Sequence, residues 1–92
     1  MPTVIGYHDV EDTEHWLSSS KREEVFGPLG VTGIRTFVSP DRPNKVAVLM
    51  DVPDMGAVME FMQTQGAADA MSYDGVRPET LVLLVEQGPA SA

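Results

Sequence analysis

The clearest pattern in this chain is the placement of apolar residues in three strand-like stretches, Pro2–His8, Lys45–Val52 and Thr80–Val85. Side chains in a strand point alternately to opposite faces, yet these stretches carry apolar residues on both faces. The sequence offers only two helical segments, which are enough to cover one face of a four-stranded sheet. We therefore predict that a second copy of the chain covers the other face, giving a homodimer.

The first half of the chain predicts a strand, a helix and a second strand. Met1–Tyr7 has the composition of a strand. A helix follows, capped by Asp12 or Thr13 and stopped by the pair Gly27–Pro28. The second strand lies within Gly30–Pro40 and is the most polar of the four.

The second half predicts a strand, a helical region and a last strand. The segment Pro40–Asn44 is rich in turn-forming residues and predicts a hairpin, so the second and third strands are antiparallel neighbours. After the third strand, Asp54 can cap a helix that runs to about Gln65 and is followed by a shorter helical piece, Ala67–Tyr73. Glu79–Glu86 is the expected last strand.

This order of elements predicts an α+β fold, a ferredoxin-like βαββαβ sandwich with right-handed crossovers. Residues 1–87 form one domain in this interpretation, and residues 88–92 have the composition of a loose C-terminal tail. The pattern leaves open whether even-numbered or odd-numbered strand residues face the helices, because both sets are apolar.

Composition narrows the possible functions. The chain has 92 residues, a formal net charge of −8, six Lys and Arg residues and no cysteine. Nucleic acid is excluded as an expected partner because phosphate binding needs clustered Lys and Arg. Disulfides and thiolate metal sites are excluded by the lack of cysteine. With no apolar run long enough to span a bilayer, we expect a cytoplasmic protein with no membrane contact. The sequence has no set of His ligands suited to a metal, so we expect no metal and no cofactor.

With this order of elements, the chain resembles the dimeric α+β barrel superfamily, which includes the antibiotic-biosynthesis monooxygenases and muconolactone isomerase-like proteins. It looks like an uncharacterised branch of that superfamily. The resemblance covers nearly the whole chain and rests on Val4, His8, Val10, Asp12, Trp16, Gly30-Val31, Asp41–Asn44, Val46–Val52, Met71 and Gly75–Glu79. It implies that two sheets meet across a dimer to form a barrel, and that each protomer keeps a pocket between its own sheet and helices.

His8 is the first candidate for chemistry, because histidine transfers protons near neutral pH. It ends the first strand, and Gly6 on the same strand face leaves space beside it for a ligand. The alternative is an imidazole bonded to a backbone carbonyl or to Asp12. The open strand register decides whether His8 faces the pocket or the dimer interface.

Trp16 is expected to point inward from the first helix, either as core filler or as an aromatic wall for a flat ligand. Helical spacing from Trp16 gives a stripe with a small, polar centre: Ser19, Ser20, Glu23 and Phe26. Either a water-filled or ligand-filled gap lies beneath the helix, with Ser20 in contact with any ligand, or the helix is rotated so that Leu17, Lys21 and Val25 face inward.

Methionine is concentrated in one part of the chain, with five of six methionines between residues 50 and 71. Flexible methionine side chains fill irregular cores and also line adaptable binding sites. We predict that Met50, Met62 and Met71, together with Phe37, line the pocket, with core packing as the alternative.

Arg35 and Tyr73 are the candidates for stabilising an anion formed on a ligand. A salt bridge to one of the many acidic residues is the alternative for Arg35, and an interface position is the alternative for Tyr73. The resulting hypothesis is a homodimer that binds a small apolar or aromatic molecule, as a cofactor-independent monooxygenase or an isomerase with His8 as base. The rival is a non-catalytic ligand carrier or a structural dimer that serves a protein partner.

Overall fold

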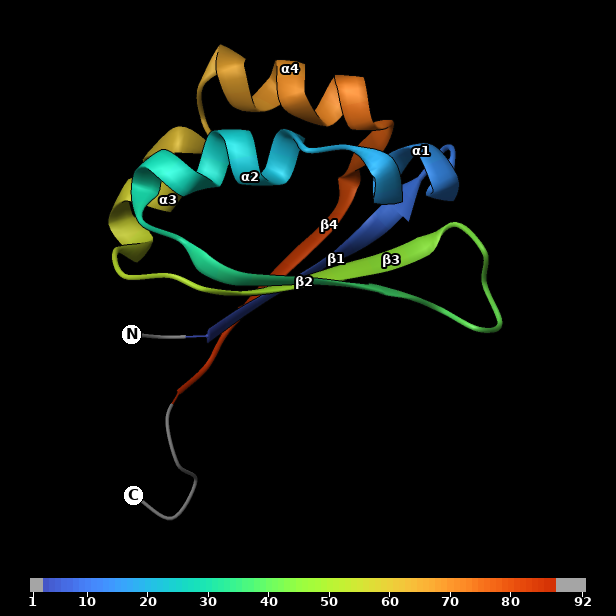
Figure 1. Cartoon of the computed structure of the whole chain (residues 1–92), viewed down its shortest axis with the longest axis horizontal. Coiled ribbons are helices and arrows are strands. Elements are labelled where there is room, and N and C mark those ends of the chain that lie inside the picture. The colour runs from blue at the N-terminus through green and yellow to red at the C-terminus, as the bar shows by residue number, and fades with distance from the viewer. Residues whose placement is uncertain (1–2, 88–92) are drawn as a thin grey trace.

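Four strands form one antiparallel sheet in the order β2-β3-β1-β4 in the computed structural model, which describes residues 3–87. The elements are β1 (Thr3–Val10), α1 (Thr13–Ser18), α2 (Lys21–Phe26), the 3-10 turn η1 (Gly27–Leu29), β2 (Thr32–Val38), β3 (Lys45–Asp51), α3 (Met55–Phe61), α4 (Gln65–Asp74) and β4 (Val76–Val85). All helices lie on one side of the sheet (Figure 1). The structure confirms the predicted ferredoxin-like α+β fold. The predicted tail, residues 88–92, lies outside the described residues.

The strand register settles which face meets the helices. In β1 and β3, Val4 pairs with Met50, Gly6 with Val48, and His8 with Val46. The even-numbered residues of both strands are buried, whereas the odd-numbered residues between them are partly or fully exposed. We call the even-numbered side the inner face and the opposite side the outer face. His8 therefore lies on the inner face, beneath the helices.

The predicted first helix is wrong in one respect, because the structure has two short helices in its place. Asp12 is the N-cap, and its carboxylate accepts a hydrogen bond from the His15 N–H. Ser19 ends α1 with an extended backbone, and its hydroxyl accepts a hydrogen bond from the Lys21 N–H. Serine side chains compete for backbone groups in this way, which disfavours a helix interior. The break between Ser18 and Lys21 gives α2 a direction of its own.

The second helical region also divides in two, as predicted, but its boundaries differ. The Asp54 side chain caps α3, which ends at Phe61 rather than near Gln65. The Thr64 hydroxyl then accepts from the Ala67 N–H and caps α4. Threonine at an N-cap satisfies a backbone donor that the helix leaves free.

The turn from α4 into β4 needs a glycine. Gly75 has a φ of 72°, a left-handed conformation that ends the helix. The chain enters β4 immediately, at Val76, three residues before the predicted start at Glu79. This turn brings the end of α4 close to β1, since the Glu11 N–H donates to the Gly75 carbonyl at 2.9 Å.

Buried apolar side chains from β1, β3 and the helices form the core on the inner face. Valine is the commonest of them, and Trp16 is the largest, with 1% of its surface exposed. The cluster consists of Val4, Val10, Trp16, Val31, Val46, Val48, Met50, Val52 and Val58. None of the helices among residues 3–87 is long and apolar enough to cross a membrane.

Candidate functional site

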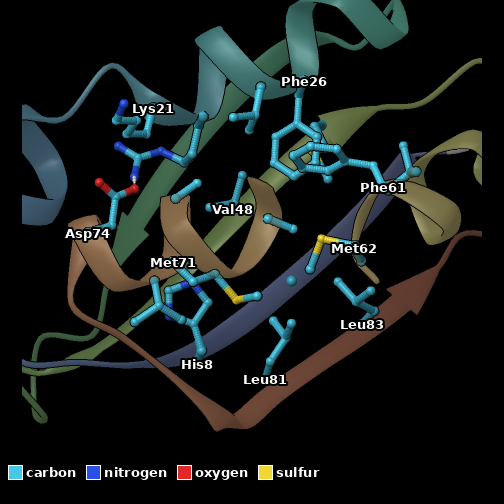
Figure 2. Close-up of a pocket in the computed structure, with 18 of the residues that line it drawn as sticks. His8, Lys21, Phe26, Val48, Phe61, Met62, Met71, Asp74, Leu81 and Leu83 are labelled. Carbon is cyan, nitrogen blue, oxygen red and sulfur yellow. Dashed lines mark hydrogen bonds and ion pairs between the residues drawn. The ribbon is translucent and has the colours of Figure 1, made fainter. Parts of the chain in front are cut away.

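An apolar cavity of about 90 Å³ lies between the inner face of the sheet and the helices. In Figure 2, Phe61, Met62 and Leu83 lie toward one end of this cavity, whereas Lys21 and Asp74 lie toward the other. A single buried water needs only about 10–15 Å³, so the cavity has room for a small molecule. It is smaller than the engineered cavity of about 150 Å³ known to hold benzene, so an aromatic ring requires some side chains to move.

Flexible side chains give the cavity the means to expand. Met50, Met62 and Met71, the three methionines predicted to contact a ligand, all line it. Met62 and Met71 are only partly buried, and thioether side chains change shape at little cost. Phe26 and Phe61 form an edge-to-face pair at 6.0 Å between ring centroids beside them. This end of the cavity is suited to an apolar or aromatic group.

The floor of the cavity includes Gly6, where a side chain would not fit without displacement. A β-carbon at this position would lie 3.0 Å from Cδ2 of Leu83. The glycine therefore lets Leu83 of the neighbouring strand β4 pack over β1. Gly6 itself lies two residues before His8 on the same face of β1.

His8 lines the cavity with only 6% of its surface exposed. Its ring meets the Trp16 ring edge-to-face, with 5.7 Å between centroids. Burial lowers the pKa of His8 below its ordinary value of 6.5; its hydrogen bond with the Asp9 backbone opposes this shift and the nearby Arg22 charge adds to it. The imidazole is therefore neutral at pH 7.

The tautomer of His8 follows from its neighbour. Nδ1 lies 3.4 Å from the Asp9 carbonyl oxygen, which can only accept a hydrogen bond. We therefore assign the proton to Nδ1, which leaves Nε2 as the basic nitrogen. A neutral imidazole with one free nitrogen is the form that a general base requires.

A buried ion pair forms the polar end of the cavity. Arg22 of α2 and Asp74 of α4 both line it and are 7% and 4% exposed. Arg22 Nη1 lies 3.4 Å from Asp74 Oδ2, and Arg22 Nη2 donates to the Trp16 carbonyl at 2.8 Å. The guanidinium also stacks on the Trp16 ring, with its carbon 4.2 Å from the ring centroid. Burial lowers the pKa of Arg22, while Asp74 opposes that shift.

Sequence reasoning missed this pair. Arg22 belongs to neither of the two helix faces considered for an unbroken helix, and it turns inward only because the helix breaks before Lys21. Asp74 lies one residue beyond the predicted helical piece Ala67–Tyr73, whereas in the structure it is the last residue of α4. A signal was present in the consecutive serines, Ser18 to Ser20, which disfavour a continuous helix.

Four of the predicted site residues are not part of the cavity. Ser20 is exposed and its hydroxyl donates to Glu24 at 2.6 Å. Ser20 and Tyr73 line a separate polar depression on the surface, together with His15. Arg35 and Phe37 pair with Leu49 and Ala47 of β3, so they point to the outer face. The period of two along a strand explains their absence, because the inner face takes the other set of residues.

The outer face carries two rows of side chains that cross all four strands. In β1, Ile5 and Tyr7 are the central members, and each pairs with a residue of β3 and a residue of β4. One row is Leu84, Ile5, Leu49 and Arg35, and the other is Val82, Tyr7, Ala47 and Phe37. Five of these eight are large apolar side chains that are at least one-third exposed. This is a continuous apolar surface.

The charges at the edges of this surface are ordinary. Lys45 and Asp9 form a 2.8 Å salt bridge that is about one-third exposed. The side-chain hydrogen bond from Lys45 lowers the pKa of Asp9.

Among residues 3–87, no three His, Asp or Glu side chains come together as metal ligands would. The chemically distinctive groups are thus His8 and the Arg22–Asp74 pair, all within the cavity.

Comparison with known proteins shows the fold. No family model matches this sequence, and no curated protein matches it. Among solved structures, an antibiotic biosynthesis monooxygenase-like protein from Bordetella bronchiseptica is similar at a TM-score of 0.72, with 16% identity over 96% of each chain. One from Nitrosomonas europaea has a TM-score of 0.65 and 16% identity, over 96% of this chain and 98% of that one. A conserved protein from Methanosarcina mazei Go1 has a TM-score of 0.67 and 12% identity, over 96% and 92%. At these identities, the match establishes the α+β architecture and leaves the activity to be argued from the site.

Proposed function

We propose that this protein is a homodimer that binds a small apolar or aromatic molecule in the cavity and removes a proton from it, with His8 as general base. The observation that carries the proposal is a neutral, buried imidazole in the wall of an otherwise apolar cavity. Apolar pockets with a few polar groups are typical of small-molecule sites.

The proton transfer requires a ligand with an acidic C–H bond. His8 Nε2 takes the proton, and the electron pair of that bond is delocalised into an adjacent carbonyl group of the ligand. If the proton returns to a different carbon, the product is an isomer and no co-reactant is consumed. Trp16 and the three methionines, Met50, Met62 and Met71, hold the apolar part of the ligand in this scheme.

A second candidate, oxygenation, is favoured by the description of two of the similar structures as monooxygenase-like. Here the carbanion attacks molecular oxygen, a C–O bond forms, and the protonated His8 returns its proton to the peroxide. Loss of water from this hydroperoxide converts a CH₂ group to a carbonyl group. The oxidant is oxygen itself, and its second atom leaves as water.

The dimer is supported by the outer face. A second copy related by twofold symmetry would place the two rows of apolar side chains against each other, because an isologous contact pairs the same patch on both subunits. The large side chains in these rows, such as Phe37 and Leu84, are about half exposed in one chain. Arg35 lies in the same surface and would contact the partner.

The test compares the two histidines of the chain. Ligand binding is measured by calorimetry with a panel of one-ring ketones and phenols, and proton removal is measured as ligand C–H exchange with deuterated water by NMR. We expect His8→Asn to reduce exchange by at least about 100-fold, the usual scale of general-base catalysis, and to change affinity by only a few fold. The matched control is His15→Asn, because His15 lies outside the cavity.

The outcomes separate the alternatives. Equal exchange rates in wild type and His8→Asn would refute a catalytic role for His8. Binding with no exchange and no oxygen consumption would identify a ligand carrier. If no member of the panel binds, the cavity is not a ligand site and the proposal is wrong.

A further inference from the structure

The ion pair at the polar end of the cavity lacks several of the hydrogen bonds that buried charges normally make. Among the described residues, the Asp74 carboxylate accepts one hydrogen bond, at 3.4 Å, and this comes from Arg22. Within residues 3–87, neither Asp74 Oδ1 nor Arg22 Nε has a hydrogen-bond partner. Both side chains are more than nine-tenths buried, so bulk water does not compensate.

Buried charges without partners are costly. A carboxylate has about four acceptor sites and a guanidinium has five N–H donors, and in folded proteins buried polar groups are nearly always satisfied. Here two charged groups line the same apolar cavity, and each keeps an unused polar atom that is itself buried, so a ligand reaches these atoms only when side chains of the cavity wall move. Such an arrangement is stabilised when a ligand supplies the missing donor and acceptor.

We propose that the ligand bound in this cavity ends in a compact, neutral polar group that donates a hydrogen bond to Asp74 and accepts one from Arg22. A hydroxyl group or a primary carboxamide on an apolar ring has this chemistry. The inference rests on the proposed function, because it assumes that the cavity binds a small apolar molecule. Beyond that function, the inference specifies which class of small apolar molecule the cavity selects.

The charge balance of the Arg22–Asp74 pair determines which classes of ligand the cavity rejects. Arg22 and Asp74 carry opposite charges, so the buried pair itself has no net charge to offer a ligand ion. Lys21 lines the same end, but its side chain is 35% exposed and forms a salt bridge with Glu24 at 3.7 Å, so solvent and Glu24 screen its charge. A carboxylate ligand would gain the attraction of Arg22 but would meet the repulsion of Asp74 at the same point. A purely apolar ligand would leave both polar atoms without partners. Neutral phenols and amides are therefore selected over benzoates and over plain hydrocarbons.

The experiment uses phenol and toluene, which have nearly the same shape and differ by a hydroxyl in place of a methyl group. Affinities for the full chain are measured by NMR titration, with benzoate as the charged probe. We expect phenol to bind at least about tenfold more tightly than toluene, as a hydrogen bond to a charged group implies, and benzoate to bind most weakly.

Two variants test whether Asp74 causes the preference for phenol over toluene. Asp74→Asn keeps the shape of the side chain, removes its charge and adds a donor, so the preference for phenol over toluene should fall below about threefold. Asp69→Asn is the matched control, because Asp69 is an exposed aspartate on the same helix, and it should retain the wild-type preference. Thermal melting of each variant establishes that it is folded.

Each result supports or overturns the inference. The inference is wrong if toluene binds as well as phenol, or if Asp74→Asn retains the full preference for phenol. Either result would mean that Asp74 does not hydrogen-bond the polar group of the ligand, although the cavity would remain a ligand site. If benzoate binds best, the polar end selects anions instead. If none of the three probes binds, the proposed function itself fails and the inference fails with it.

Discussion

The two faces of the sheet are built from the same strands, yet they are different surfaces. On the inner face, the even-numbered residues of β1 and β3 are buried beneath the helices, and they include Gly6 and His8. On the outer face, the odd-numbered residues of β1 and β3 are more exposed, and Leu84 of β4, which pairs with Ile5 on this face, is 53% exposed. One face is packed around a cavity, and the other is continuous and apolar.

This difference shows how one strand serves two purposes. Because successive side chains alternate, β1 can place His8 in the cavity and Tyr7 on the opposite surface with no change in backbone. The inner face tolerates a glycine and a histidine because the helices and Trp16 cover them. The outer face has no such cover within the described chain, so apolar area alone distinguishes it.

The largest effect is expected from breaking the inner face. Trp16→Ala removes a side chain that is 1% exposed and contacts both His8 and Arg22. We expect a loss of about 3–5 kcal/mol in the free energy of unfolding, measured by urea denaturation. The neighbouring residue provides the control, because Leu17 is 45% exposed and Leu17→Ala should cost less than about 1 kcal/mol. Similar losses for the two variants would contradict the described packing.

A smaller effect, on association rather than on folding, is expected from a charge on the outer face. Leu84→Glu places a carboxylate where the proposed dimer buries apolar side chains, so dimerisation should weaken at least about tenfold in analytical ultracentrifugation. Met59→Glu introduces the same charge at an exposed position on α3, which is on the helical side of the sheet, and should leave the dimer intact. An unchanged dimer in Leu84→Glu would show that the outer face is not the interface.

The smallest effect concerns the pH dependence of stability. The pKa of His8 is below 6.5 in the folded chain, so between that lowered pKa and 6.5 the unfolded chain binds more protons. His8 therefore has no effect on the pH dependence of the free energy of unfolding above about pH 7, and it lowers that free energy as the pH falls. His8→Asn should show a smaller decrease in unfolding free energy between about pH 7.5 and 5.5 than His15→Asn does. Equal decreases in the two variants would contradict the neutral state assigned to His8.

Local sequence signals were sufficient for the order of elements but not for the direction of every helix. The hairpin at Pro40–Asn44 and the caps at Asp12 and Asp54 all have short-range causes, and the structure has them as expected. The face that meets the helices was not predictable, because hydrophobicity is similar on the two sides of β3. That choice is made by tertiary contacts, in particular by Trp16 and the other residues that pack on the even-numbered side.

The candidate site was partly predictable for the same reason. Met62, which follows the helical period, could be placed near a pocket from sequence alone, whereas His8 was a candidate whose face depended on the strand register. Arg35 and Phe37 were undetermined because they depend on the register. The pairing of Arg22 with Asp74 joins two helices that are far apart in the chain, and it depends on a helix break and on the exact end of α4. The hydrophobic periodicity of the sequence gives no sign of a contact between two side chains so far apart in the chain.

Trp16 is the one tryptophan of the chain and lies between the imidazole of His8 and the guanidinium of Arg22. In optical terms, the protein therefore carries its own reporter at the wall of the cavity. Its emission comes from a buried environment, and an indole in direct contact with two polar groups responds to any change in their charge or distance. Filling, protonation and opening of the cavity should each alter the same signal.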